Sequence, residues 1–116
     1  MNPVDFSTLQ MIPISSTDDA SIDWTAAFAC YGGKGADNTV VVPFSIAPGG
    51  HLGWHTDSLE ETQFVLPKDL RHDLRNTGTV PLIAIAFFSG DALTQTFENV
   101  MLPPKGHLLT SPNAAA

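Results

Sequence analysis

The chain has 116 residues, of which 43% are hydrophobic and 15% are charged. This length suits one domain with one core, and the composition is typical of a globular protein and excludes a disordered one. The formal net charge is −7 with five Lys and Arg residues, and an acidic chain without a basic cluster repels phosphate groups, so neither nucleic acid nor an anionic membrane is an expected partner.

The single cysteine, Cys30, excludes an internal disulfide and a thiolate-rich zinc site. No apolar run is long enough to span a bilayer, and the start MNPVDFSTLQMIPIS lacks the basic residues and apolar core of a signal peptide, so we expect a cytoplasmic protein. Because so small a fraction of the chain is charged, we expect part of its apolar surface to be buried in a homodimer.

Residues 1–38 are expected to form an N-terminal arm. Within it, SIDWTAAFACYGG (21–33) fits a short helix with Ser21 as N-cap and Gly32 as terminator. Its aromatic residues would also suit an extended edge strand, and the sequence leaves both interpretations open.

The following segments are predicted to be β-strands separated by Gly, Pro and Asn turns. Pro43 suits an edge strand or a bulge in the first of them, and the unbroken apolar run near residue 85 fits a strand covered on both faces. Such a pattern predicts an all-β sandwich or barrel with its core in residues 39–100, followed by a C-terminal loop and tail at 101–116. The predicted strands are TVVVPFSI (39–46), ETQFVL (61–66), RHDLRN (71–76), TVPLIAIAFFSG (79–90) and LTQTFENV (93–100).

Candidate metal ligands are concentrated in PGGHLGWHTDSLEETQFVLPKDLRHDLRN (48–76). Strand alternation places His55 and Asp57 on one side of the chain, and gives Glu61 and His72 inward positions on neighbouring segments. Imidazole and carboxylate ligands without thiolate suit Fe(II), Mn(II), Ni(II), Cu(II) or Zn(II), and two His with one carboxylate is the arrangement of non-haem iron oxygenases. Surface groups, or polar groups satisfied within the fold, are the alternative.

The same stretch resembles the first motif of the small single-domain cupins, G-x5-H-x-H-x3,4-E-x6-G. The chain supplies Gly49, His55, Asp57 in place of the second His, and Glu61, with the spacing kept up to that Glu. Lys68 stands where the closing Gly is expected.

The second cupin motif, G-x5-P-x-G-x2-H-x3-N, also has a partial match. The chain supplies Pro67, Asp69 in place of Gly, His72 and Asn76. The resemblance implies a jelly-roll β-barrel with a metal ion inside it, held by residues at motif positions.

Two departures from the cupin pattern have consequences. Asp57 replaces an imidazole with a harder oxygen donor, which disfavours Cu(I) and favours Fe(II) or Mn(II). His51 could substitute for it, but we expect His51 at the outer end of the strand, which disfavours that role. The two motifs also overlap where cupins have a hairpin, so the barrel is expected to be truncated by about two strands. We expect a second copy to complete it, by edge pairing or strand exchange.

Several residues keep two interpretations. Asp57 is a fourth ligand, a catalytic base or a local cap beside Ser58. Gln63 is either a catalytic-site residue whose side-chain amide donates a hydrogen bond that orients Glu61, or it forms a hydrogen bond with a neighbouring strand. Glu61 is expected to point inward and its neighbour Glu60 outward, and Asn76 is expected to serve a turn rather than catalysis.

The expected function is therefore that of a metal-dependent cupin enzyme of the dioxygenase type acting on a small organic molecule. His55, Asp57, Glu61 and His72 would hold the ion, with Fe(II) or Mn(II) favoured and Ni, Cu or Zn also compatible. The alternatives are a non-catalytic cupin-like binding or scaffold module, and a metal-free isomerase or cyclase that uses Glu61 and His72 for acid–base chemistry.

Overall fold

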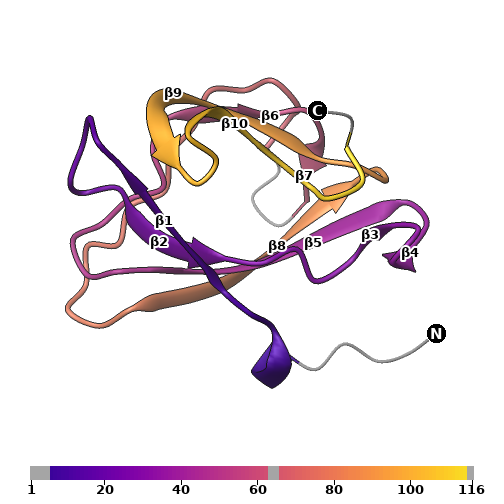
Figure 1. The fold of residues 1–116 in the computed structure, drawn as a ribbon, viewed down its shortest axis with the longest axis horizontal. Helices are drawn as coiled ribbons and strands as arrows, with labels where there is room; N and C mark the ends of the chain where they lie inside the picture. The colour runs from indigo at the N-terminus through magenta and orange to yellow at the C-terminus, as the bar shows by residue number, and fades with distance from the viewer. Residues whose placement is uncertain (1–5, 63–65, 115–116) are drawn as a thin grey trace.

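The computed structural model describes residues 6–62 and 66–114. Within these ranges the chain is built of strands and one short 3₁₀ helix, η1 (Phe6–Thr8), without an α-helix (Figure 1). The predicted all-β class is confirmed. No helix in the described part of the chain is long and apolar enough to cross a membrane. The strands are β1 (Ile12–Ser16), β2 (Asp23–Ala26), β3 (Tyr31–Gly32), β4 (Gly35–Ala36), β5 (Thr39–Ile46), β6 (His55–Asp57), β7 (Glu60–Glu61), β8 (Leu82–Ser89), β9 (Thr94–Leu102) and β10 (Gly106–Thr110).

The main sheet curls into a nearly closed antiparallel barrel of the jelly-roll type (Figure 1). Its strand order is β10-β9-β1-β2-β5-β8-β7, and β6 pairs with β9. Only residues 58–59 separate β6 from β7, so one short stretch of chain joins the β9 side of the sheet to its β8 side. This closure brings the predicted site residues onto the wall that faces the inner side of β5 and β8.

The predicted N-terminal arm belongs to the sheet. Residues 23–26 form β2, so of the two interpretations of segment 21–33 the helical one is wrong. Trp24 and Ala26 point inward while Asp23 and Thr25 do not, which is the two-residue period of a strand. Strands β1, β2 and β10 all belong to the main sheet, so the sheet includes residues on both sides of the predicted core range of 39–100.

Strand β5 matches its predicted range, but it is not an edge strand. It lies between β2 and β8, with Pro43 opposite Ile85 of β8. On the other side, the Pro43 carbonyl accepts a bond from Ala27 N, whereas a proline has no N–H to return. This missing donor explains why β2 ends at Ala26 and why its ladder with β5 stops at Phe44.

Strand β8 also departs from its prediction. Its apolar run was expected to be covered on both faces, yet Ile83 is 80% exposed and Phe87 is 42% exposed. The inward residues of the strand, Ala86 and Phe88, are buried. One face of β8 therefore lines the core and the other lies on the surface of the protein.

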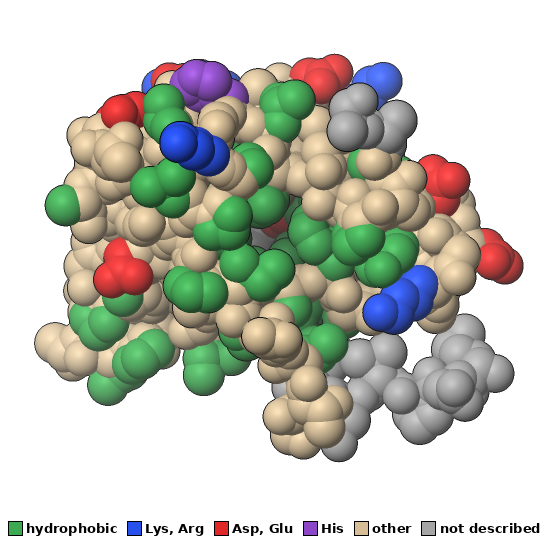
Figure 2. Space-filling view, viewed as in Figure 1, with side chains coloured by type: hydrophobic (Ala, Val, Ile, Leu, Met, Phe, Trp, Pro, Cys, Tyr) green, Lys and Arg blue, Asp and Glu red, His purple; other side chains and the backbone are tan. Residues whose placement is uncertain are grey.

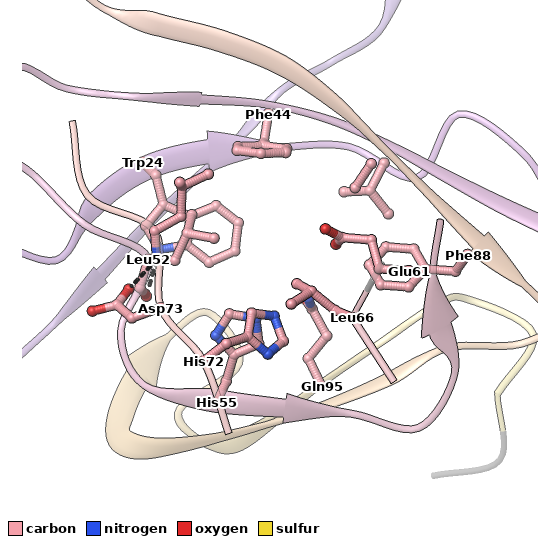
Figure 3. Close-up of a pocket in the computed structure, with 13 residues that line it drawn as sticks. Trp24, Phe44, Leu52, His55, Glu61, Leu66, His72, Asp73, Phe88 and Gln95 are labelled. Atoms are coloured by element: carbon pink, nitrogen blue, oxygen red, sulfur yellow. Dashed lines mark hydrogen bonds between the residues drawn. The ribbon is translucent and has the colours of Figure 1, made fainter. Parts of the chain in front are cut away.

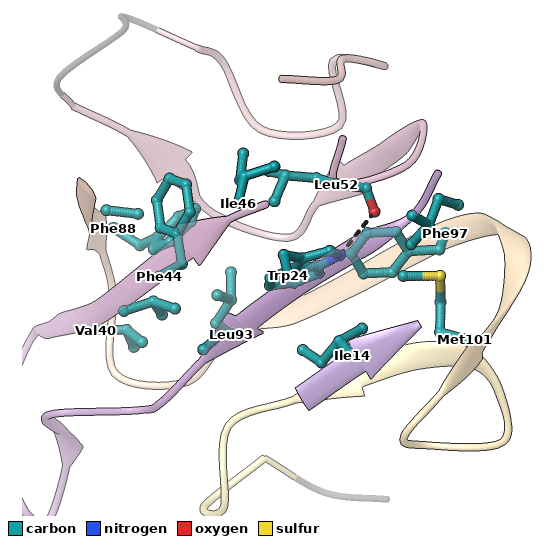
Figure 4. Close-up of a cluster of buried hydrophobic side chains, with 14 residues drawn as sticks. Ile14, Trp24, Val40, Phe44, Ile46, Leu52, Phe88, Leu93, Phe97 and Met101 are labelled. Carbon is teal, nitrogen blue, oxygen red and sulfur yellow. Dashed lines mark hydrogen bonds between the residues drawn. The ribbon is translucent and has the colours of Figure 1, made fainter. Parts of the chain in front are cut away.

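A hydrophobic core fills the barrel (Figure 4). Trp24 is 3% exposed and donates its indole N–H to the carbonyl of Leu52 at 3.1 Å, which satisfies the one polar atom of its side chain. Phe97 packs beside it, with ring centroids 6.0 Å apart. The core leaves one side of the barrel interior to polar residues. The buried members are Ile14, Ile22, Trp24, Ala26, Val40, Val42, Phe44, Ile46, Leu52, Ala86, Phe88, Leu93, Phe97 and Met101.

Gly90 fixes the turn that follows β8. Its φ is +145°, and a Cβ there would lie 2.6 Å from a methyl group of Leu59, in the short link between β6 and β7. We expect Gly90→Ala to lower the free energy of unfolding by about 1–3 kcal/mol, measured by urea denaturation. Gly106→Ala is the control, because a Cβ at Gly106 meets nothing within 4 Å. Equal urea midpoints for the two variants would contradict this account of Gly90.

Candidate metal centre

The barrel encloses a cavity of about 210 Å³ between its polar wall and its hydrophobic core (Figure 3). His55, His72 and Gln95 lie on one side of it, and Trp24 and Phe44 lie across from them. The cavity thus has an apolar side and a polar side. Its lining residues are Trp24, Val42, Phe44, Leu52, His55, Glu61, Leu66, His72, Asp73, Leu74, Ala86, Phe88 and Gln95.

His55, Asp57 and His72 form a group of potential ligands. One ligand atom from each lies within 4.8 Å of the others. His55 and Asp57 are alternate residues of β6 and so point to the same side. His72 is held beside them by the backbone, because the amide of each histidine donates to the carbonyl of the other, at 3.0 and 2.9 Å. The predicted segment 71–76 therefore pairs locally with residues 51–55, although it forms no regular strand.

Both imidazole rings are oriented by main-chain carbonyls. His55 Nδ1 lies 2.7 Å from Gly53 O, and His72 Nδ1 lies 2.8 Å from Leu70 O. A carbonyl oxygen only accepts, so each Nδ1 is the protonated nitrogen and donates. In the neutral ring the Nε2 lone pair is then left for a ligand, which is the usual arrangement of a metal-binding histidine.

The Asp57 carboxylate is the buried centre of the group. It is 2% exposed, and its Oδ1 accepts a bond from Gln95 Nε2 at 3.0 Å. Its Oδ2 is buried without a hydrogen-bond partner in the described part of the chain, while His72 Nε2 lies 3.1 Å away. His55 Nε2 lies 3.8 Å from Oδ1.

A cation is required between these groups. Two neutral imidazoles would turn lone pairs toward a carboxylate that also only accepts, and a buried carboxylate without a counter-charge is strongly unfavourable. Either a proton on His72 or a metal ion removes the conflict. The contact of His72 with the Asp57 carboxylate raises the pKa of His72, whereas burial lowers the pKa of His55 and keeps that ring neutral.

The spacing of the group fits one ion. Ligand atoms that each lie about 2.1 Å from a tetrahedral metal are ~3.4 Å apart. His72 Nε2 lies 3.1 Å from Asp57 Oδ2 and His55 Nε2 lies 3.8 Å from Asp57 Oδ1, and one ligand atom from each of the three residues lies within 4.8 Å of the others, so a small inward shift of the side chains would complete a site for one ion. Two imidazoles and one carboxylate are also a complete three-ligand set for a catalytic metal, which leaves further positions open.

Glu61 lies in the same cavity but outside this group of three. As predicted, it points inward and is 7% exposed, whereas Glu60 is exposed. Burial and the nearby Asp57 carboxylate raise the pKa of Glu61 to about 7, with His72 acting in the opposite direction. Glu61 can thus hold a proton near neutral pH. Gln63, the residue expected to orient it, lies outside the described residues.

Gln95 is a site residue that the sequence interpretation missed. It is 7% exposed on β9 and donates to Asp57. The signal was available, since Gln95 and Phe97 alternate on the inward face of a predicted strand. An inward Gln on such a strand needs a polar partner.

His51 is not available as a substitute ligand. Its ring is 4% exposed and bridges two carboxylates, with Nδ1 2.6 Å from Asp73 Oδ2 and Nε2 2.9 Å from Asp19 Oδ2. The second oxygen of Asp73 accepts from the amide of Gly53, at 3.0 Å, and Gly53 in turn holds His55. His51 is therefore linked to the potential ligand His55 through Asp73 and Gly53.

We expect His51→Ala to lower the free energy of unfolding by about 3 kcal/mol, because it removes the ring that lies 2.6 Å from the largely buried Asp73 carboxylate and 2.9 Å from Asp19. The measurement is urea denaturation at pH 6. His107→Ala is the matched control. His107 is exposed, and its ring contacts only main-chain carbonyls among the described residues, so we expect a loss of less than about 1 kcal/mol. Losses of equal size would show that the bridge contributes nothing.

Asn76 serves a turn, as predicted. Its side-chain oxygen accepts from Gly78 N at 2.9 Å, and its amide donates to the carbonyls of Ile46 and Val80. These bonds close the loop before β8 and leave no donor for the cavity. Asp57 likewise makes no cap at Ser58, because its oxygens face Gln95 and His72.

A scan against models of known protein families, a search of curated proteins and a search of solved structures each found no match. The function must therefore be argued from the barrel and the chemistry of its cavity.

Proposed function

We propose that this chain is a cupin-like metal-dependent enzyme that acts on a small organic molecule as a dioxygenase. One divalent transition-metal ion would be held by His55, Asp57 and His72. The observation that carries the proposal is the buried Asp57 Oδ2, which in the described chain has no hydrogen-bond donor while His72 is neutral and which faces His72 Nε2 at 3.1 Å. The barrel fold and the two anchored imidazoles support it.

The donor set favours Fe(II) or Mn(II), since it combines nitrogen and hard oxygen ligands, and Ni, Cu and Zn are also compatible. Such an ion, when bound by three protein ligands, supplies open positions at which substrate and oxygen can be activated. The Gly53 and Leu70 carbonyls fix the ligand rings, and Gln95 fixes the Asp57 carboxylate. Glu61 stands in the same cavity as a group that can take or return a substrate proton.

The test is the metal content of protein purified without a His-tag. We expect about one equivalent of a transition metal in the wild type and less than roughly a tenth in His72→Ala, because loss of one of three ligands weakens binding strongly. His107→Ala should keep the wild-type content. Less than a tenth of an equivalent in the wild type, unchanged by His72→Ala, would refute the metal site.

A metal-free isomerase or cyclase is the second candidate, and Glu61 is the observation in its favour. A carboxyl group with a pKa of about 7 that lines an apolar cavity is suited to general acid–base catalysis without a metal. Turnover that persists after chelation and is lost in Glu61→Gln would select this candidate. If the protein neither retains metal nor shows turnover, a non-catalytic binding or scaffold module is the remaining function.

We further propose that the protein acts as a homodimer in the cytoplasm. Val80 and Ile83 are 68% and 80% exposed, and their burial against a second copy would remove apolar surface from water. Light scattering at micromolar concentration tests the dimer, and a monomeric mass would exclude it.

A further inference from the structure

We propose that the cavity takes an uncharged molecule with a single ring, apolar over most of its surface, with a hydroxyl group at one edge. We infer equally that it excludes carboxylates and phosphates. The inference rests on the proposed function in one respect, namely that this cavity is the substrate site.

The volume of the cavity limits the ligand to one ring. A cavity of ~150 Å³ lined by apolar side chains is known to take up benzene. The cavity in this barrel measures about 210 Å³, which is enough for one six-membered ring with a few substituent atoms. A second fused ring would extend beyond this volume.

Aromatic side chains from three neighbouring strands form the apolar side. Trp24 of β2, Phe44 of β5 and Phe88 of β8 all line the cavity. Figure 3 shows Trp24 and Phe44 on the opposite side from His55 and His72. An aromatic ligand can stack on these walls in an offset or edge-to-face arrangement. A polar ligand finds no hydrogen-bond partner among the described residues on this side of the cavity.

The polar side offers hydrogen bonds to one edge of such a ring. Glu61, His72 and Gln95 line the cavity there and include both donors and acceptors. A hydroxyl group donates one bond and accepts others, so it can satisfy either kind of partner. A ligand without a polar group would leave these side chains desolvated and unpaired.

The charges around the cavity oppose an anionic ligand. Glu61 and Asp73 line it and Asp57 lies beside it, and none of the described lining residues is a Lys or Arg. The guanidinium of Arg71 is held elsewhere, 4.0 Å from the centre of the Trp54 ring and in an ion pair with Glu98. In the metal-free protein a carboxylate would lose its hydration without gaining a basic partner. With a divalent ion bound, the Asp57 and Glu61 carboxylates would already neutralise its two charges, so an anionic ligand would add a net negative charge to the cavity.

The test compares phenol with benzoate, which share a ring and differ in charge at pH 7.5. Dissociation constants are measured by calorimetry on the protein as purified and again after chelation, and metal content is determined on the same samples. We expect phenol to bind at least ~10-fold more tightly than benzoate in both states. Equal or tighter binding of benzoate, or failure of both to bind, would overturn the inference.

The two proposals fail separately in this experiment. Preference for phenol in protein that never contains metal would support the ligand class and refute the metal-dependent function. Tight benzoate binding in metal-replete protein would refute the ligand class and leave the metal site intact.

Glu61→Gln tests the origin of the selectivity. At pH 7.5, above its pKa of about 7, Glu61 is mostly ionised, so the substitution removes most of one negative charge and keeps the shape of the side chain. We therefore expect benzoate to bind about 10-fold more tightly while phenol changes less than ~3-fold. Glu60→Gln is the matched control, because the exposed Glu60 does not line the cavity. A phenol-to-benzoate ratio in Glu61→Gln equal to that in Glu60→Gln would show that the Glu61 charge does not exclude anions.

Discussion

Adding a divalent transition metal to the chelator-treated protein is expected to raise its melting temperature by about 10 °C. At a free metal concentration 100 times Kd, a ligand of the native state adds ~2.7 kcal/mol to the free energy of unfolding. For a chain of this length each kcal/mol corresponds to roughly 3–5 °C. The physical source is the Asp57 carboxylate, whose buried Oδ2 gains a cation in place of a shared proton. Differential scanning fluorimetry with Mn(II), Fe(II), Ni(II) and Zn(II) provides the measurement.

The variant that tests this shift is His72→Ala. Without one of its three ligands the site should respond to metal by less than about 2 °C, because affinity falls steeply with ligand number. His107→Ala should respond like the wild type, since His107 lies on β10 away from the cavity. A shift of the same size in His72→Ala would mean that the metal binds outside the proposed group.

Raising the pH from 5 to 8 is expected to destabilise the metal-free wild type by about 2 kcal/mol more than Glu61→Gln. The folded-state pKa of Glu61 is about 7, above its ordinary value of 4.5. Between these values the folded state binds a proton that the unfolded state has lost, so stability falls as pH rises. The full pKa shift of Glu61 corresponds to ~3 kcal/mol of unfolding free energy. Because Glu61 is partly screened by solvent, we expect about 2 kcal/mol.

Comparison with Glu61→Gln is needed because the two ligand histidines also titrate. The raised pKa of His72 makes stability fall as pH rises above 6.5, and the lowered pKa of His55 makes it rise as pH approaches 6.5 from below. Both contributions remain in the variant and largely cancel in the difference. Urea denaturation at pH 5, 6.5 and 8 gives the curves, and Glu60→Gln should follow the wild type. Parallel curves for wild type and Glu61→Gln would show that Glu61 titrates normally.

Local alternation was sufficient to predict much of the fold and part of the site. The strand at 39–46 has the predicted bounds, and the inward positions of His55, Asp57 and Glu61 follow from residue spacing. Segment 21–33 was ambiguous because a few apolar residues fit either period, and only pairing with β1 and β5 decides for the strand. Ile83 is exposed because none of the described residues forms a second layer over the outer face of β8.

The cupin resemblance implied that His55 and His72 share a site, but the backbone contacts that hold distant residues together could not be predicted. His72 reaches His55 through paired backbone amides, and nothing in the local pattern of either segment specifies that register. His51 was expected at the outer end of a strand, yet it is buried between Asp19 and Asp73, which are separated from it by 32 and 22 residues. Such an arrangement depends on barrel closure, which a one-dimensional pattern does not contain.

The oxygen atoms that hold the two imidazoles belong to the peptide backbone two positions upstream, at Gly53 and Leu70. Replacing the side chain at position 70 therefore leaves the carbonyl that orients His72 in place. His72 keeps its tautomer through such changes. The rings are also immobilised before any ligand arrives, so little rotational freedom is left to lose on binding. Evolution can accordingly vary the loop around Leu70 while the nitrogen that faces Asp57 stays in place.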